Sequence, residues 1–261
     1  MYRQIYIELQ QKSRGRAASV YIVGEGEVLN PEYFRRINLP FQEDAAAFAM
    51  TNSTVDLRDG FPSQMFPAEY VMFADPFSSL FPTVQQVGYQ IYDMLLHDQL
   101  IAQYYVLDRT YSLTDHEVKL YRKIRPIDRA CVDVLQERLR SYYPDTPFVY
   151  EPIYFLALME YDRHMTYFDF WNKALFFYTE NGETVEFNLN DTETFSRLSF
   201  EVESHIPGTE LIITDQETEI YRSLMPEYAR TAVNQDISTS DSLTVRFESP
   251  AAGYGSTGHI H

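Results

Sequence analysis

The fold of the first part of the chain is decided by residues 18–31, which read ASVYIVGEGEVLNP. Residues 18–23 are an apolar run that predicts a buried strand. The run ends at the glycine turn 24–26, and a helix is expected to begin at Asn30, because Asn caps a helix well and the following Pro31 fits its first turn. A strand, a glycine turn and a helix in this order predict an α/β unit.

The rest of the first part alternates in the same way between apolar strand patterns and helical patterns. Asp75-Pro76 stops one buried strand, and the turn 114–117 joins two alternating runs into a β-hairpin. For residues 1–145 we therefore predict an α/β domain of three layers with a small mixed sheet. The other predicted helices are residues 3–13, 83–96 and 128–142, and the predicted strands are residues 70–74, 104–113 and 118–124.

The pattern changes after Pro144. Prolines at 147 and 152 interrupt residues 146–166, which we interpret as a connecting segment. Residues 167–250 contain many short strands separated by turn residues, which predicts an all-β sandwich similar to carbohydrate-binding modules. One predicted turn covers residues 190–194. Residues 251–261 are rich in Gly, Ser and Thr and are predicted to be a disordered tail.

Charge is distributed unevenly along a chain whose net charge is −17. Residues 146–261 hold 6 Lys and Arg against 19 Asp and Glu, a balance of −13, whereas residues 1–145 hold 15 against 19. Such an acidic second part does not suit nucleic acid or anionic lipid, since phosphate contacts need clustered cations. Neutral sugars, cations or basic proteins are the partners that fit this charge.

The sequence contains no motif of a known catalytic centre. The third glycine of a dinucleotide-binding turn would fall at Leu29, and Glu25 and Glu27 would repel phosphate, so the turn 24–26 is interpreted as a tight turn. The single cysteine, Cys131, lies in a helical apolar pattern and is expected to be a core residue. We predict no catalytic residue and no cofactor, apart from a structural calcium ion discussed below.

Three charged residues stand together in the loop before Gly60: Asp56, Arg58 and Asp59. An arginine between two carboxylates commonly forms an ion pair that pins a loop. The alternative is a ligand-binding group, and a third hypothesis is a hydrolase or transferase that uses Asp56, Asp59 or Glu69.

Aromatic residues are concentrated near the start of the predicted sandwich, around the only tryptophan of the chain. Sugar-binding sandwiches stack pyranose rings on exposed Trp or Tyr side chains. Tyr167, Trp171 and Tyr178 are therefore candidate ligand-binding residues, and the alternative is that these side chains belong to the core.

Oxygen-bearing side chains are grouped at Asn188, Asn190 and Asp191. Carboxylate and amide oxygens are the ligands that calcium prefers, so these residues are candidates for a structural calcium site. The alternative is an acidic turn in contact with solvent.

The first part resembles the soluble region that follows the membrane helices in bacterial glycosyltransferases similar to dolichyl-phosphate-mannose–protein mannosyltransferases. The resemblance covers somewhat over half of the chain. It is carried by the opening helix and by the segments 20–24, 29–30, 55–62, 68–71, 75–76, 121–123 and 143–145.

This resemblance implies a non-catalytic region at the extracytoplasmic face of a bacterial membrane. The catalytic carboxylates of the family lie in a loop near the first membrane helices, so none is carried over to this sequence. Glycan or lipid-linked sugar would be the ligand, and membrane attachment would come only through an N-terminal spanning region that this sequence lacks. The opening helix has no capping residue, which favours a piece of a longer protein. The alternative is a free-standing cell-surface carbohydrate-binding, adhesion or scaffold module.

Overall fold

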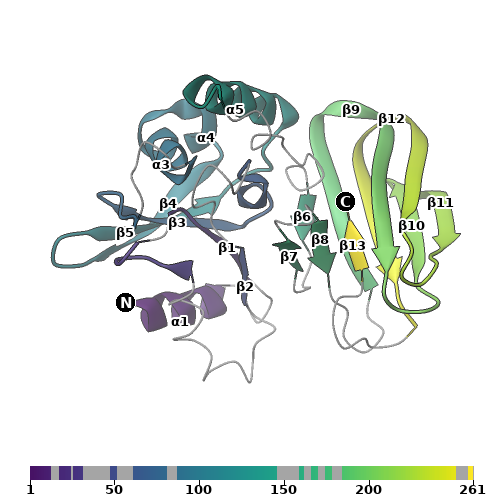
Figure 1. Cartoon of the computed structure of the whole chain (residues 1–261), viewed down its shortest axis with the longest axis horizontal. Helices are drawn as coiled ribbons and strands as arrows, with labels where there is room; N and C mark the ends of the chain where they lie inside the picture. Colours follow the sequence, from purple (N-terminus) through teal and green to yellow (C-terminus); the bar gives the residue numbers. More distant parts are fainter. Residues whose placement is uncertain are drawn as a thin grey trace. The chain divides into compact units, whose positions relative to one another are not determined.

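The structure is a computed structural model of the chain, which divides into two compact units, Met1–Ala157 and Leu158–His261 (Figure 1). The described residues are 1–12, 18–24, 26–31, 48–51, 61–80, 87–145, 159–161, 166–169, 174–177, 184–250 and 258–260.

The first unit contains one sheet and several helices. Its helical elements are α1 (Tyr2–Lys12), the 3-10 turn η3 (Ser63–Met65), α3 (Val87–His97), α4 (Gln99–Ala102) and α5 (Arg129–Tyr142). Its strands are β1 (Ala18–Ile22), β2 (Phe48–Thr51), β3 (Tyr70–Asp75), β4 (Tyr105–Ser112) and β5 (Glu117–Lys123).

The five strands form a mixed sheet in the order β2-β1-β3-β5-β4. The strands β2, β1 and β3 are parallel, while β5 runs antiparallel to both β3 and β4. The hairpin between β4 and β5 has the short turn that the sequence predicts. A bulge at Asp108 interrupts the register between these two strands.

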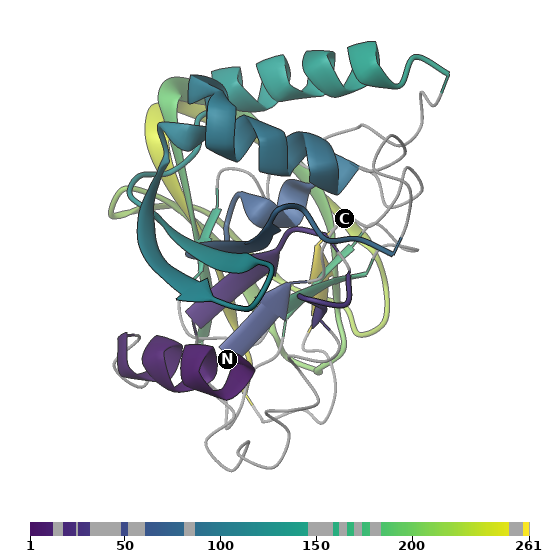
Figure 2. The same cartoon turned by 90° about the vertical axis from the view of Figure 1, so that its left-hand side faces the viewer.

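Helices lie on both faces of this sheet, as Figure 2 shows with α1 on one side and α3 and α5 on the other. Alternate residues of a strand pack on opposite faces of the sheet, because successive side chains of a strand point in opposite directions. Tyr21 and Val23 belong to the core beneath α3, α4 and α5, and Val20 and Ile22 to the core beneath α1. The near-continuous apolar run 18–23 is thus explained by burial on both faces.

Helix α5 lies where the sequence predicts it, because a capping residue and an apolar spacing specify it locally. The side chain of Asp128 accepts a hydrogen bond from the Cys131 backbone N–H at 2.8 Å and caps the helix. Val132, Leu135 and Leu139 are fully buried at helical spacing. Burial of each such side chain contributes about 1.5–3 kcal/mol.

Helix α1 is held on the sheet by apolar burial and by contacts with β4. Ile5 and Leu9 are fully buried one turn apart. The Tyr111 hydroxyl donates to Glu8 Oε2 at 2.8 Å, and Lys12 forms an ion pair with Asp108 at the bulge. Since β4 is an edge strand, the bulge and these charges also protect it from pairing with another chain.

The described part of the second unit consists of strands, in agreement with the predicted all-β class. Its strands are β6 (Met159–Tyr161), β7 (Thr166–Asp169), β8 (Ala174–Phe177), β9 (Thr184–Ser204), β10 (Glu210–Asp215), β11 (Thr218–Leu224), β12 (Thr231–Glu248) and β13 (Gly258–Ile260). Pairing follows the order β11-β10-β12-β9-β13-β8-β7, and β6 also pairs with β9.

The long strands β9 and β12 pair with each other along their lengths and curve together (Figure 1). The first half of β9 also pairs with β6, and its second half pairs with β13. The register shifts between Asp236 and Ser242, where the pair changes direction. Both halves carry buried side chains at alternate positions, with Phe187 and Phe200 among them.

The predicted turn at residues 190–194 is wrong. These residues continue β9 from Thr184 to Ser204 without a break. Polar residues mark turns in short hairpins, but here they lie on a strand at the shifted part of the pairing with β12.

Two segments outside the predicted sandwich contain strands. Within the predicted connecting segment 146–166, β6 pairs with β9, and within the predicted disordered tail 251–261, β13 pairs with β8 and β9. The Gly-, Ser- and Thr-rich composition of the tail predicts a low strand propensity. The three residues of β13 nevertheless form a strand, because they pair with a strand on each side. The predicted helix after Asn30 continues outside the described residues. In the described part of the chain, no helix is long and apolar enough to cross a bilayer.

Candidate functional sites

The carboxyl ends of parallel strands are the first place to look for a ligand site in an open α/β sheet. Strand β1 leads into the glycine turn, and β3 leads into the cis peptide bond Asp75-Pro76. A Cβ atom placed on Gly26 would lie 2.4 Å from Ser78 Oγ, which no real side chain tolerates. The turn is therefore packed tightly against the segment that follows β3.

The other glycine of the turn is equally confined. Gly24 has φ +88°, and a Cβ there would lie 2.8 Å from the ring of Phe77. The backbone N–H of Gly26 donates to the Leu29 carbonyl at 2.9 Å. The glycines thus permit close packing within the chain, which explains their presence without a bound phosphate.

Asp75, at the end of β3, is the centre of a polar cluster. The Tyr92 hydroxyl donates to Asp75 Oδ1 at 2.7 Å, and Lys119 forms an ion pair with Asp75 Oδ2. The hydrogen bond from Lys119 lowers the pKa of the Asp75 carboxyl, and the same contact raises the pKa of Lys119. Burial and the contact with Asp75 raise the pKa of Tyr92.

These shifts describe a cluster in which the charged groups stabilise each other. A general acid or base works best when its pKa lies near the working pH. The pKa values of Asp75 and Lys119 move away from neutrality, in opposite directions. Each group is therefore held in its charged form by the other.

Cys131 is a core residue in the structure. Its side chain is buried, and its thiol donates to the Leu100 carbonyl at 3.4 Å. Burial raises the pKa of the Cys131 thiol to about 12, so the reactive thiolate is scarce at neutral pH.

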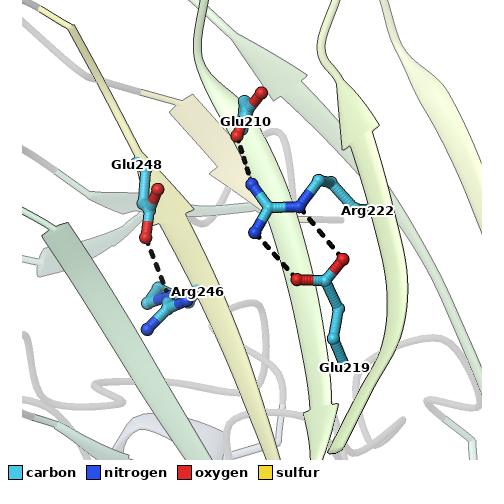
Figure 3. A network of polar contacts seen from close by, with 5 residues as sticks. All are labelled: Glu210, Glu219, Arg222, Arg246 and Glu248. Atoms are coloured by element: carbon cyan, nitrogen blue, oxygen red, sulfur yellow. Dashed lines mark hydrogen bonds and ion pairs between the residues drawn. The ribbon is translucent and has the colours of Figure 1, made fainter.

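In the second unit, one sheet face carries a network of ion pairs (Figure 3). Arg222 of β11 binds both carboxylate oxygens of Glu219, at 3.0 and 2.8 Å, and reaches Glu210 of β10 at 2.5 Å. Arg246 Nε of β12 lies 3.2 Å from a Glu248 oxygen, although the geometry is not that of a hydrogen bond. The contact with Arg222 lowers the pKa of Glu219. The charged groups of this face pair with each other, so few of them are available to bind a ligand.

A different arrangement occurs at the corner between β11 and β12, around Tyr228. This residue has φ +53°, which is unfavourable for a bulky side chain. Its backbone N–H donates to the Ser204 carbonyl at 2.8 Å, which fixes the corner to the end of β9. The side chain is 67% exposed, although a large ring normally gains free energy by burial.

The exposed Tyr228 ring stacks on the ring of His205. The ring centroids are 5.1 Å apart and the planes differ by 26°. His205 Nε2 lies 3.1 Å from a Glu203 carboxylate oxygen. Arg230 lies 3.9 Å from Glu203, and its other end lies 3.8 Å from Glu201. Through His205, the exposed ring is connected to a series of charged groups that both donate and accept hydrogen bonds. We call these five residues the Tyr228 corner.

Most of the binding residues predicted from the sequence lie outside the part of the chain that the structure describes. Asp56, Arg58, Asp59, Trp171 and Tyr178 lie outside the described residues. Tyr167 lies on β7, where it is paired in register with Phe176, and its side chain lies outside the described part.

Glu69 and Asp75 lie at opposite ends of β3, so the hypothetical acid Glu69 is not near the polar cluster. The Glu69 backbone N–H donates to Ser19 Oγ at 2.9 Å, at the amino ends of β1 and β3. Asp56 and Asp59 lie outside the described residues, so the hydrolase or transferase hypothesis stays a prediction.

The candidate calcium ligands lie on a strand. Asn188 of β9 is opposite Thr244 of β12, and its Oδ1 accepts a hydrogen bond from the Thr244 hydroxyl at 2.8 Å. The backbone of Asn190 and Asp191 continues β9, while their side chains lie outside the described part. Within the described ranges, no cluster of three or more His, Cys, Asp or Glu residues could hold a metal ion. The calcium site stays a prediction.

The Tyr228 corner was not predicted from the sequence. Residues 225–230 lie between two strand patterns and carry no motif. A tyrosine shortly after Pro226 is the only local signal, and its exposure depends on a backbone conformation that no sequence pattern specifies.

Comparisons with known proteins give no match to any protein family and none to any curated protein. Among solved structures, the chain is similar to a family 29 carbohydrate-binding module variant complexed with cellulohexaose, with TM-score 0.30 and 15% identity over 40% of this chain and 76% of that chain. A second variant, complexed with mannohexaose, gives TM-score 0.28 and 14% identity over 38% and 76%.

A family two carbohydrate esterase from Cellvibrio japonicus gives TM-score 0.29 and 11% identity, over 40% of this chain and 29% of that chain. All three TM-scores are below 0.5 and all identities are below 25%. The likeness therefore establishes neither a shared fold nor a function. None of these three proteins is a mannosyltransferase, so the resemblance of the first part to that family stays a prediction.

Proposed function

We propose that this protein is a non-catalytic glycan-recognition protein and that its second unit binds sugar at the Tyr228 corner. The observation that supports the proposal is an exposed tyrosine ring, stacked on His205 and held in an unfavourable backbone conformation. Local strain of this kind persists where surrounding structure enforces it, and it is frequent at ligand sites.

The chemistry of the corner fits a pyranose ring. One face of a sugar ring carries C–H groups that stack on an aromatic face, and its edge carries hydroxyls that both donate and accept hydrogen bonds. Glu201 and Glu203 can accept hydrogen bonds from hydroxyls, and Arg230 can donate them. The two carboxylates favour a neutral sugar over an acidic one.

The first test is the affinity of the full chain for neutral oligosaccharides. Mannohexaose and cellulohexaose are suitable probes, with an oligogalacturonate of similar length as the acidic comparison. Tyr228→Ala is expected to weaken binding to a neutral probe by about tenfold or more, which corresponds to about 1.4 kcal/mol. Tyr228→Phe is expected to retain most of the affinity, because stacking needs the ring and not the hydroxyl.

Tyr142→Ala is the matched control, since Tyr142 is 51% exposed on α5 in the other unit. Its substitution is expected to leave the affinity unchanged. Equal affinity of the unmodified chain and Tyr228→Ala, or no binding to any neutral probe, would overturn the proposal.

We further propose that the parent protein is a membrane glycosyltransferase whose extracytoplasmic region includes this chain. Support comes from the resemblance of the first part to that family. Membrane fractionation of the native cells tests it with an antibody against this chain. A membrane-bound band much heavier than 30.6 kDa is expected, whereas a band of that mass outside the membrane fraction would contradict the proposal and favour an adhesion or scaffold module.

A further inference from the structure

The second half of β9 and the first half of β12 carry a continuous row of exposed side chains. Three directly opposite pairs follow one another along the register: Glu201 with Ala232, Ser199 with Asn234, and Arg197 with Asp236. Directly opposite residues share one face of a sheet, and so do residues two apart along a strand. All six residues are exposed, whereas the intervening Phe200 and Val233 are buried. The six residues therefore form one face of the sheet, which we call the polar row.

The polar row continues into the Tyr228 corner, because Glu201 belongs to both. Arg230 lies 3.8 Å from Glu201 and 3.9 Å from Glu203, and Glu203 in turn contacts His205 at 3.1 Å. Side chains at 201, 203 and 205 share one face, since they alternate along β9. From Arg197 to His205 the strand rises about 27 Å, which is much longer than one sugar ring.

The side chain of Asn234 is held in one orientation on this face. Its Oδ1 accepts a hydrogen bond from the Ser199 hydroxyl at 2.8 Å and one from Arg197 at 3.4 Å. Because both partners donate, they fix the oxygen on their side and leave the two amide N–H groups for an acceptor. Among the described residues, no acceptor is found for these N–H groups.

The charged groups on this face are paired more loosely than the network in Figure 3, where Arg222 contacts two carboxylates at 3.0 Å or less. The two contacts of Arg230, at 3.8 and 3.9 Å, are too long for hydrogen bonds. In the part of the chain that the structure describes, the carboxylates of Glu201 and Asp236 accept no hydrogen bond. Hydrogen-bonding groups of both kinds therefore remain for a ligand.

We propose that the sugar site at the Tyr228 corner extends along the polar row and binds a linear, neutral oligosaccharide, with Asn234 contacting the sugars distant from the corner. The inference rests on the proposed function, which places the first sugar on the Tyr228 ring. Each further sugar brings hydroxyls that both donate and accept hydrogen bonds. Arg197 and Asn234 can donate to them, and the carboxylates of Glu201 and Asp236 can accept from them.

The middle of the row has room for a sugar ring. Ala232 is exposed and has the shortest side chain of the six, so a ring can lie flat between the corner and Asn234. The carboxylates of the row and the corner favour a neutral chain over an acidic one.

Isothermal titration calorimetry of the full chain tests the proposal, with mannobiose and mannohexaose as one series and cellobiose and cellulohexaose as the other. In the series that binds, the hexasaccharide is expected to bind about tenfold or more tightly than the disaccharide. The reason is that each added hydrogen bond contributes about two- to tenfold in affinity.

Two substitutions in the row sharpen this test. Asn234→Ala is expected to weaken hexasaccharide binding about fivefold and to leave disaccharide binding unchanged, because a disaccharide reaches only the Tyr228 corner. Ala232→Ile fills the middle of the row with a side chain that favours a strand, and the same pattern is expected. Unchanged disaccharide binding also shows that each variant is folded.

Gln235→Ala is the matched control. Gln235 follows Asn234 along β12 and lies opposite the buried Leu198, on the other face, so its substitution is expected to leave both affinities unchanged.

The two proposals fail in different ways. Equal affinity for disaccharide and hexasaccharide, lost in Tyr228→Ala but unaffected by Asn234→Ala, would overturn the extended site and keep the sugar site at the corner. Unchanged affinity of Tyr228→Ala, or no binding of any of the four sugars, would overturn the proposed function and this inference with it.

Discussion

Two ion pairs of the first unit connect elements that are distant in the sequence, whereas those of Arg222 in the second unit stay within one hairpin. Lys12 reaches Asp108 across 96 residues, and Lys119 reaches Asp75 across 44. In the second unit, Arg222 reaches Glu219 and Glu210, three and twelve residues away.

This difference indicates where a ligand site can be found. In the first unit, the sheet edge that binds ligands in related architectures is filled by the chain itself, with Gly26 against Ser78. In the second unit, Tyr228 lies at the corner between β11 and β12 with an exposed ring. This edge of the first unit is therefore packed by its own chain, and the proposed sugar site lies in the second unit.

The largest expected effect comes from removing one buried ring in each unit. Phe73 is fully buried in the first unit, and Phe187 is 1% exposed in the second, where it meets Phe247 edge-on. Phe73→Ala and Phe187→Ala are each expected to lower the free energy of unfolding by about 3–5 kcal/mol. Denaturant unfolding of the full chain, followed by tryptophan fluorescence and circular dichroism, measures both.

If the two units are separate cooperative structures, each substitution shifts one transition only. The only tryptophan, Trp171, belongs to the second unit, so its fluorescence should respond to Phe187→Ala and not to Phe73→Ala. A fluorescence transition that moves equally with both substitutions would contradict the comparison.

A smaller effect is expected at the glycines. Gly26→Ala places a Cβ within 2.6 Å of the Ser78 backbone, which must move, and is expected to cost about 2–3 kcal/mol. Gly208→Ala places one 3.2 Å from Pro250, at φ +78°, and is expected to cost about 1 kcal/mol. The urea midpoints of the two variants measure which one loses more stability. A larger loss of stability for Gly208→Ala than for Gly26→Ala would contradict the close packing at the turn 24–26.

The smallest effects are those of the ion pairs. Lys119→Met is expected to cost about 1 kcal/mol near neutral pH, because the pair with Asp75 is partly buried. The pKa of Asp75 is lowered in the folded state, so its contribution is present above the unfolded pKa of about 3.9 and is lost as the pH falls below it. The difference between Lys119→Met and the unmodified chain should therefore shrink in acid.

Arg222→Met supplies the comparison in the second unit, where the partners are exposed to solvent. Its effect on the urea midpoint should be smaller than that of Lys119→Met, and should fall with added salt. A larger effect for Arg222→Met would show that the face in Figure 3 is a stabilising network after all.

The sequence predicts the first unit well where local chemistry specifies an element. Asp128 as a cap fixes the start of α5, and the apolar run before Gly24 fixes β1. The sequence does not predict that α1 lies on the opposite face from α5, since that depends on which residues of each strand meet which helix.

The second unit is predicted less completely because its organisation depends on pairing over long distances. Polar residues around Asn190 resemble a turn, yet long-range pairing with β12 keeps them in a strand. The same holds for Gly258–Ile260, which pairing orders despite its composition. Tyr228 was missed because exposure and a positive φ arise only from the folded corner.

The two long strands of the second unit have a consequence for how that unit forms. Because β9 pairs with β6, β12 and β13, and β12 also pairs with β10, most of the sheet depends on these two strands. Their pairing joins Thr184 to Glu248 and Val202 to Thr231, so a long loop must close before the sheet can form. Folding of this unit should therefore be slow and concerted, and its amide protons on β9 and β12 should exchange with solvent last of all.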